Sequence, residues 1–274
     1  MAKHIDGNNF LRYHIKNNKP FAAGKIGGTE LKLLYTFLNN MPVPQDLKEE
    51  AENVSGLVPT NKQTLKWFST TFFEALSRMD LLCKWSAIIP QLEEQLIEKK
   101  TNAYTTPLQH LEPYFFDNPW TECLEGKKVL VFSPFADSID KNFSKLDKIW
   151  NNKIKPNFDI IPYRYPTSIT ITKNSKAKNA QEIYDKFNSI IHTEDFDIGI
   201  FGTGYTGLLF ASECKKIGKG GIHLGGATQM LFGVLGNRWK SIKEFDSFIN
   251  EHWTKPTKDE TPERVDVVEE ACYW

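Results

Sequence analysis

Three common guides to function are missing from this sequence. Its 34 Lys and Arg residues balance its 34 Asp and Glu residues, so no net charge draws it to nucleic acid or to an acidic membrane surface. No apolar run reaches the roughly 18 residues of a membrane span, and residues 1–10 contain no apolar stretch typical of a signal peptide. We therefore expect a cytoplasmic protein with no nucleic-acid partner and no membrane span.

Cysteine is scarce as well. The four cysteines are far apart in the chain and include no C-x-x-C pair. A zinc site or a disulfide framework usually shows a closely spaced pair or a regular spacing. The sequence therefore predicts neither, and we expect reduced, mostly buried thiols at Cys83, Cys123, Cys214 and Cys272.

The chain does show an alternation of strand-like and helix-like segments. Short apolar runs bounded by Gly or Pro precede stretches with helical spacing. This order is typical of parallel strands joined by right-handed helical crossovers. It predicts an α/β fold with a Rossmann-like, doubly wound, mostly parallel sheet. The expected strands lie at 21–26, 126–134, 158–166, 197–201 and 220–224.

Residues 45–100 do not follow this alternation. They carry apolar side chains at helical spacing, Phe68 and Phe72 among them, and no strand-like run. A connector rich in proline and aromatic residues follows at 107–120. Together these segments predict a helical insert over about 45–120.

We expect a single α/β domain over residues 1–274. The early strand unit at 21–26 joins the same sheet across the helical insert. A polar, proline-containing tail follows at about 254–274.

A glycine turn separates the strand-like DIGIF from a helix-like segment. Gly202, Gly204 and Gly207 fit the pattern G-x-G-x-x-G, with Tyr205 inside it. Such glycines let backbone N–H groups approach a diphosphate at the start of the helix. They also serve tight turns and close packing without any ligand, and that alternative stays open.

Dinucleotide binding requires one further residue that is missing. An NAD-binding unit places Asp or Glu at the end of the next strand, where it binds the ribose hydroxyls. Here that strand ends in His223, Gly225 and Gly226. An NAD-dependent oxidoreductase is therefore the less favoured alternative, and another phosphate-bearing ligand is preferred.

The second glycine turn also opens a helix-like segment. His223, Gly225, Gly226, Thr228 and Gln229 lie in it, so two turns would direct helix N-termini into one crevice. His223 is a candidate for contact with a phosphate or a hydroxyl. A structural histidine satisfied within the fold is the alternative.

A third turn follows the first expected strand. Lys25 could balance phosphate charge, with Gly27 and Gly28 forming the turn and Thr29 as an expected N-cap. Glu30 is a candidate metal ligand or general base. Alternatively it only interacts favourably with the helix dipole.

Two further segments carry candidate site residues. Asp137 and Ser138 follow the strand at 126–134 and could bind sugar hydroxyls or act as a base, or else simply cap a helix. Arg238 lies in a glycine-flanked loop that suits an anion, or is a surface arginine. Agreement among the strand ends predicts one ligand crevice.

These segments resemble a family. KIGGTE at 25–30 is similar to the R-F-G-D-G-E segment of bacterial glycosyltransferases of the GT-D fold. Other segments look like bacterial and viral proteins assigned to that fold, and the likeness covers the first strand unit, most of 126–240 and the end of the chain. These segments are PFADSI (134–139), FGTGYTG (201–207), IHLGGATQMLFG (222–233), GNRW (236–239) and CYW (272–274).

The resemblance implies a metal site at the first turn. There the family's Arg, Asp and Glu fall on Lys25, Gly28 and Glu30, and the Asp and Glu resemble a DXD motif that holds Mn²⁺ or Mg²⁺. The Asp is absent here. One carboxylate holds a hard cation weakly, because such cations want several oxygen ligands. Either Glu30 acts with a second ligand such as Asp137, or the metal is dispensable and Lys25, Arg238 and helix dipoles balance the charge, or activity is lost.

The resemblance also implies an activity. A glycosyltransferase would move a sugar from a nucleotide-diphosphate donor to a glycan or other hydroxyl acceptor, with Glu30 or Asp137 as catalytic base. The alternative is a non-catalytic nucleotide-sugar or glycan-binding module, which the glycine at position 28 favours.

Overall fold

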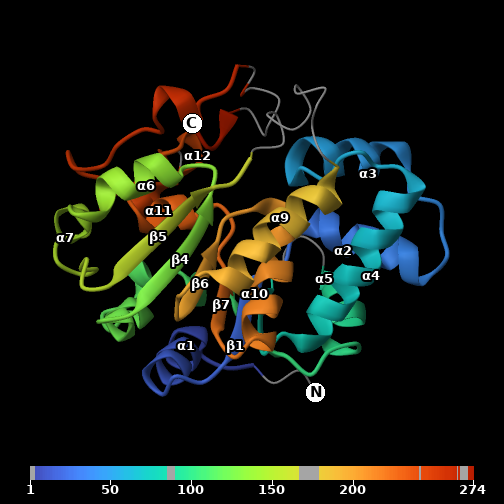
Figure 1. Cartoon of the computed structure of the whole chain (residues 1–274), viewed down its shortest axis with the longest axis horizontal. Coiled ribbons are helices and arrows are strands. Elements are labelled where there is room, and N and C mark those ends of the chain that lie inside the picture. Colours follow the sequence, from blue (N-terminus) through green and yellow to red (C-terminus); the bar gives the residue numbers. More distant parts are fainter. Residues whose placement is uncertain (1–3, 85–89, 167–178, 241, 264, 266–270) are drawn as a thin grey trace.

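Seven strands form one sheet in which all neighbours are parallel, in the order β3-β2-β1-β7-β6-β4-β5 (Figure 1). The computed structural model describes residues 4–84, 90–166, 179–240, 242–263, 265 and 271–274. The α/β, Rossmann-like fold predicted from the sequence is confirmed. The strands are β1 (Phe21–Lys25), β2 (Leu81–Lys84), β3 (Tyr104–Pro107), β4 (Lys128–Ser133), β5 (Asp159–Arg164), β6 (Ile198–Phe201) and β7 (Gly220–His223).

The strand order reverses within the sheet. From β4 the chain runs outward to β5, whereas from β6 it runs the other way to β7. The early strand β1 lies between β2 and β7 and joins them into one sheet, because Ala23 pairs with Leu81 of β2 on one side and with Ile222 of β7 on the other. Open α/β sheets bind ligands at the carboxyl ends of the strands where such a reversal occurs. The reversal between β4 and β6 therefore marks the expected position of a site.

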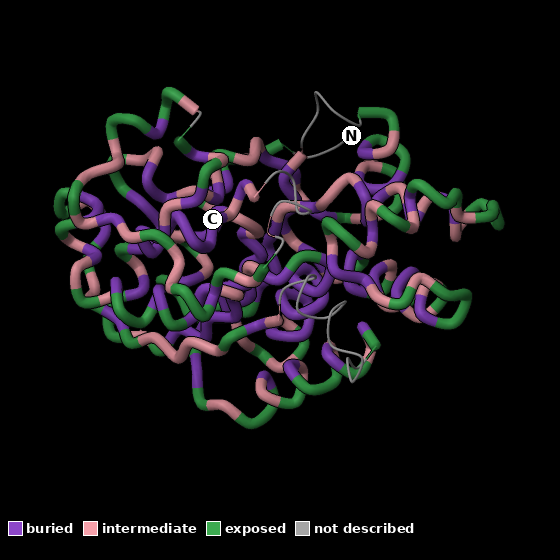
Figure 2. The backbone as a smooth tube through the Cα atoms, turned by 90° about the horizontal axis from the view of Figure 1, so that it is seen from above, coloured by how far each residue is buried: buried purple, intermediate pink, exposed green. Residues whose placement is uncertain are grey.

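Helices cover both faces of the sheet (Figure 1). Successive strand residues point to opposite faces, so Val129 and Val131 join one core while Leu130 and Phe132 join the other. Buried residues run through the interior and exposed ones lie at the periphery (Figure 2). One core includes α2 (Gly28–Leu38), α4 (Lys62–Arg78), α9 (Ala180–Thr193) and α10 (Gly207–Lys216); the other includes α1 (Gly7–Lys16), α6 (Ala136–Phe143), α7 (Leu146–Ile149) and α11 (Ala227–Leu231).

Helix α10 lies unusually close to the sheet. A Cβ atom at Gly221 would lie 2.4 Å from the Ala211 carbonyl oxygen, and one at Gly24 would lie 2.6 Å from Leu208. Only glycine leaves room for this approach. The helix that follows the G-x-G-x-x-G turn is thereby held against β1 and β7.

The expectation that residues 45–100 contain no strand is wrong. Strand β2 lies within this block, and β3 lies shortly after the end of the block. Only Leu81, Leu82 and Cys83 of β2 are buried, and so short a run gives no period that separates it from a helix. The remaining elements of 45–124 are helical: α3 (Gln45–Glu50), α4, α5 (Pro90–Glu93), π-helices at Ala51–Ser55 and Glu94–Glu98, and 3₁₀ turns at Leu108–Leu111, Pro113–Phe115 and Trp120–Leu124.

The end of the chain packs back onto the body of the protein. The backbone N–H of Asn237 donates to Trp274 O at 3.2 Å, and that of Arg238 donates to Cys272 O at 2.9 Å. These bonds hold residues 271–274 beside α12 (Asn237–Lys240), ahead of α13 (Lys243–Asp246). The four cysteines are free thiols, as expected. Within the described residues, no helix has the length and apolar character needed to cross a membrane.

Candidate functional site

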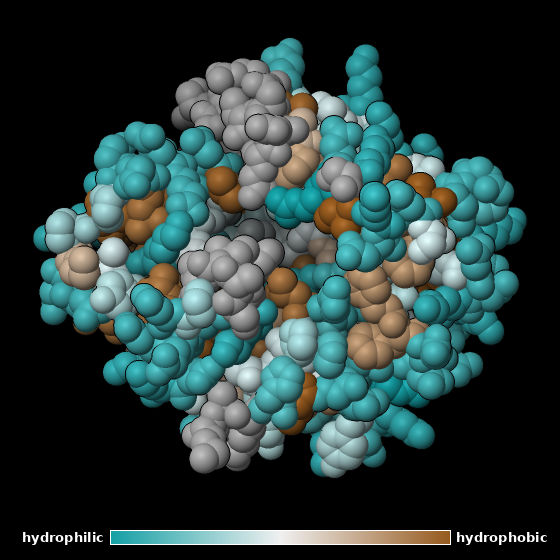
Figure 3. Space-filling view, turned by 180° about the vertical axis from the view of Figure 1, so that it is seen from behind, coloured by the Kyte–Doolittle hydropathy of each residue, from teal (hydrophilic) through white to brown (hydrophobic). Residues whose placement is uncertain are grey.

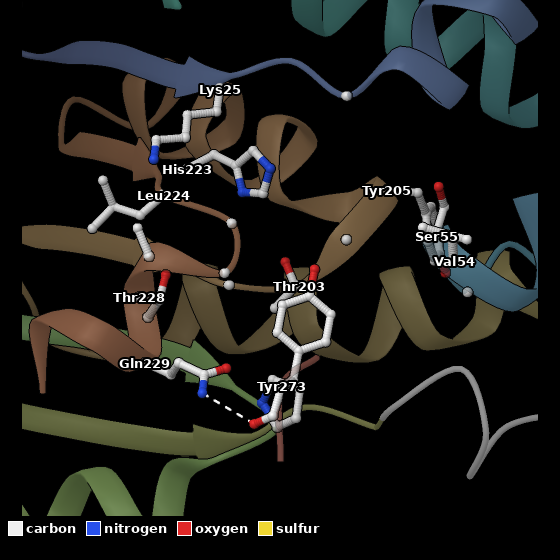
Figure 4. Close-up of a pocket in the computed structure, with 18 of the residues that line it drawn as sticks. Lys25, Val54, Ser55, Thr203, Tyr205, His223, Leu224, Thr228, Gln229 and Tyr273 are labelled. Carbon is white, nitrogen blue, oxygen red and sulfur yellow. Dashed lines mark hydrogen bonds between the residues drawn. The ribbon is translucent and has the colours of Figure 1, made fainter. Parts of the chain in front are cut away.

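A cavity of about 700 Å³ opens at the carboxyl ends of the strands (Figure 4). Its volume is in the range of sites that bind nucleotide-sized ligands. All four strand-end turns chosen from the sequence contribute to its lining, with residues from 25–30, 133–135, 202–205 and 223–229.

The face opposite to that of Figure 1 is mostly hydrophilic, with hydrophobic side chains in small separate groups (Figure 3).

Lys25 lies at the end of β1 and is already paired. Its ammonium forms an ion pair with Glu112, and each of these side chains is only 12% exposed. The Tyr114 hydroxyl donates to the other carboxylate oxygen of Glu112. The charge of Lys25 is therefore balanced by the protein itself. Glu112 comes from the stretch expected to be an irregular connector, in which no sequence pattern indicates a site residue.

Glu30 is buried in the first turn of α2, inside the cavity wall. Its carboxylate folds back over Gly27, where a Cβ atom would lie 2.0 Å from Oε2. Burial raises the pKa of Glu30, and the negative charge of Glu50 adds to the rise, while hydrogen bonds from Ser55 and from its own backbone N–H oppose it. A buried carboxyl with a raised pKa is suited to exchanging a proton.

Thr29 does not cap helix α2. The N-cap is Gly27, and the Thr29 hydroxyl donates instead to Glu50 Oε1 at 2.6 Å. The expected capping role is therefore wrong, because the helix already begins at Gly28 and Thr29 lies inside its first turn. Glu50 also pairs with Lys32 at 3.1 Å.

The three glycines of the G-x-G-x-x-G turn each make room for a protein group. Cβ atoms there would lie 2.9 Å from Thr228 at Gly202, 2.6 Å from the Ser55 carbonyl oxygen at Gly204, and 1.8 Å from His223 Nδ1 at Gly207. Gly204 also has a positive φ of 55°. Protein packing therefore accounts for this motif in part, and Gly207 itself does not line the cavity. Tyr205 does line it, and its hydroxyl donates to Ala180 O at 2.8 Å.

His223 is buried at the end of β7, with its ring over Gly207. Its Nδ1 lies 3.0 Å from the Phe201 carbonyl oxygen. A carbonyl only accepts, so Nδ1 carries the proton and Nε2 is left as an acceptor. Burial lowers the pKa of His223 to about 4, and the charge of Lys25 contributes, although the bond to Phe201 opposes the shift. The ring is neutral at physiological pH.

Three neutral side chains complete this part of the wall. Thr203, Thr228 and Gln229 are buried, and their Oγ1, Oγ1 and Oε1 atoms have no hydrogen-bond partner among the described residues. The Gln229 amide nitrogen donates to Val234 O and to Tyr273 O, both at 3.1 Å (Figure 4). The amide oxygen is thereby fixed as the free acceptor. Gly225, with φ at 60°, and Gly226 line the cavity beside them.

Arg238 reaches the cavity together with Tyr273. Its guanidinium lies 4.9 Å from the centre of the Tyr273 ring, and Nη1 donates to the Tyr273 hydroxyl at 3.4 Å. Tyr273 and Trp274 both line the cavity. Only the likeness of CYW to family members drew attention to this segment in the sequence.

Asp137 and Ser138 do not line the cavity. Glu260 occupies the start of α6: it accepts from the backbone N–H groups of Asp137 at 2.9 Å and Ser138 at 3.1 Å, and from the Ser138 hydroxyl. The Asp137 carboxylate lies 3.5 Å from Arg164 and is half exposed. The β4 end therefore contributes Ser133–Phe135 to the cavity instead.

The described residues do not offer a ligand set for Mn²⁺ or Mg²⁺. No three His, Cys, Asp or Glu side chains within the described ranges are grouped so that they could hold a metal ion. Glu30 is bonded to Ser55, and Asp137 faces Arg164 outside the cavity. Hard cations need several oxygen ligands, so these side chains alone do not hold such an ion.

Comparison with known proteins adds no family: no family model matches the chain, and no curated protein or solved structure is significantly similar to it. The geometry of the cavity is therefore the basis for a proposed function.

Proposed function

We propose that the protein is a glycosyltransferase that binds a nucleotide-diphosphate sugar in this cavity and transfers the sugar to a glycan or other hydroxyl acceptor. The convergence of four strand-end turns on one cavity of about 700 Å³, beside the reversal of strand order, supports this proposal most. The resemblance of the same turns to GT-D glycosyltransferases is in accord with it.

The departing diphosphate needs positive charge and N–H donors. Lys25 and Arg238 line the cavity from β1 and from α12. An ammonium carries three donors, so Lys25 can bond a phosphate oxygen while it keeps Glu112, and the guanidinium of Arg238 offers a fork of donors. This arrangement stabilises the leaving group without a metal ion.

Glu30 is the proposed general base. The acceptor oxygen attacks the anomeric carbon, the bond from that carbon to the phosphate oxygen breaks, and the acceptor proton passes to the Glu30 carboxylate. Its raised pKa suits this step, since a base works best when its pKa approaches the working pH.

The test combines donor binding with one substitution. Purified protein is titrated with UDP-glucose, UDP-galactose, GDP-mannose and related donors, and turnover is followed as release of UDP or GDP, with and without Mn²⁺. Glu30→Gln should lower turnover by about 100-fold or more and leave the Kd of the donor within about threefold. Glu50→Gln, which changes another carboxyl of the same cavity, is the matched control and should keep most of the turnover, because the charge of Glu50 has the smallest of the effects on the pKa of Glu30.

Absence of binding across the donor panel would contradict the proposal. Unchanged turnover in Glu30→Gln would remove Glu30 from the mechanism.

A binding module without chemistry is the second candidate. The missing metal ligand set and the paired state of Lys25 favour it. Donor binding by the wild-type protein with no release of UDP or GDP, whatever the acceptor, would select it.

A further inference from the structure

Unpartnered polar atoms are concentrated on one wall of the cavity. The described residues include five buried side-chain oxygens without a hydrogen-bond partner, and those of Thr203, Thr228 and Gln229 belong to residues that line the cavity. The other two belong to Thr121 and Asn188, which lie elsewhere. Each unsatisfied buried group costs free energy, so three on one wall indicate a ligand that supplies their partners.

Two atoms on this wall are acceptors and nothing else. The Gln229 amide nitrogen is committed to two backbone carbonyls, so Oε1 faces any ligand as an acceptor. His223 commits Nδ1 to the Phe201 carbonyl, so Nε2 is likewise an acceptor. The two threonine hydroxyls can donate or accept. We call Thr203, His223, Thr228 and Gln229 together the neutral floor.

A phosphate does not fit the neutral floor. Phosphate oxygens at neutral pH are acceptors, and they would face the lone pairs of Gln229 Oε1 and His223 Nε2 with no proton between them. A burial that leaves acceptors facing acceptors is unfavourable. Hydroxyl groups and the N–H groups of a base carry the donors that these atoms need.

We infer that the neutral floor binds an uncharged group rich in hydrogen-bond donors, the hydroxyls of a sugar or the N–H groups of a base, and that phosphate lies elsewhere in the cavity. This deepens the proposed function and depends on it for the identity of the whole ligand. The positive charges of the cavity, Lys25 on β1 and Arg238 on α12, are not part of the neutral floor. The sequence pattern alone had suggested the opposite, a diphosphate against this turn.

Two nearly isosteric substitutions test the inference. Thr203→Val and Thr228→Val each remove an unpartnered hydroxyl without changing the shape of the side chain much. Thr121→Val removes an unpartnered buried hydroxyl outside the cavity and is the matched control. All three variants should keep or slightly raise the Tm. These hydroxyls make no hydrogen bond to the described residues, so their removal leaves no partner there unpaired.

Binding is measured by calorimetry with UDP-glucose, GDP-mannose, UDP, GDP and pyrophosphate. The double variant Thr203→Val/Thr228→Val should bind the sugar nucleotide about tenfold more weakly, with the affinity for pyrophosphate unchanged. Unchanged UDP and GDP affinity assigns the floor to the sugar, whereas an equal loss of affinity for the sugar nucleotide and for UDP or GDP assigns it to the base. Thr121→Val should match the wild type throughout.

Other outcomes overturn the inference. A loss of pyrophosphate affinity would place phosphate on the floor, and equal affinities in all variants would leave the floor without a ligand. If the wild-type protein binds no sugar nucleotide, the proposed function fails by itself. Free glucose, mannose, uridine and guanosine, followed by saturation-transfer NMR, then decide: binding that the double variant weakens supports the inference, and no such weakening contradicts it.

Discussion

The glycine turn after β1 and the glycine turns after β6 and β7 look alike in sequence and differ in what they leave for a ligand. At the β1 turn the charged side chains already have partners, since Lys25 forms an ion pair with Glu112 and Glu30 accepts a hydrogen bond from Ser55. At the ends of β6 and β7 the neutral side chains have unpartnered atoms. The charged groups at the β1 turn are thus paired within the protein, whereas neutral side chains at the ends of β6 and β7 keep hydrogen-bonding atoms without a partner among the described residues. Residue type alone does not show which polar groups are free.

The largest expected effect comes from breaking the balance at β1. Lys25→Met leaves Glu112 as an uncompensated, largely buried carboxylate and should lower the free energy of unfolding by about 3 kcal/mol, measured in urea at pH 7. Lys25→Met/Glu112→Gln should regain most of this loss. Lys32→Met breaks the Lys32–Glu50 pair, whose side chains are 44% and 36% exposed, and should cost less than about 1 kcal/mol.

A different result for Lys25→Met would contradict the view that the charge at the β1 turn is balanced within the protein. If Lys25→Met kept full stability while donor binding disappeared, Lys25 would be a ligand group and not primarily the partner of Glu112.

An effect of similar size concerns His223, on the neutral side of the comparison. Its pKa of about 4 lies below the ordinary 6.5, so the unfolded chain takes up a proton at a higher pH than the folded one. The stability is therefore fully present above pH 6.5 and falls as the pH drops toward 4, by on the order of 3 kcal/mol for this group. Glu30 acts in the opposite sense: its raised pKa makes the folded state bind the proton first, which favours folding as the pH falls through that pKa.

His223 and Glu30 change the stability in opposite directions as the pH falls. The protonation state of the His223 ring is therefore a better measurement than the stability. Nitrogen NMR of the histidine side chains, with His223→Asn to assign the signal, should show a neutral ring protonated on Nδ1 at pH 5.5. A His223 signal that titrates near pH 6.5, or a proton on Nε2, would contradict the acceptor role of Nε2.

Much of the fold could be predicted because it depends on local pattern. Apolar runs bounded by Gly or Pro and followed by helical spacing predict β1, β4, β5, β6 and β7. Strand β2 was missed since its three buried residues are too few to show a period. It becomes a strand through its neighbours β1 and β3, which the local sequence does not contain.

The candidate site was predictable in position and less so in chemistry. Parallel strands bring their carboxyl ends to one edge, so the turns meet in one cavity. The partners that decide which groups are free are distant in sequence: Glu112 is 87 residues from Lys25, and Glu260 is 122 residues from Ser138. No spacing rule connects such pairs, and so the free acceptors at Gln229 and His223 appear only in the structure.

A crystal structure of the protein with its tightest-binding sugar nucleotide tests the central claim most directly. The account predicts hydroxyl or N–H groups of the ligand within hydrogen-bonding distance of Gln229 Oε1 and His223 Nε2, with the diphosphate near Lys25 and Arg238. A phosphate oxygen against Gln229 Oε1 and His223 Nε2 would contradict it.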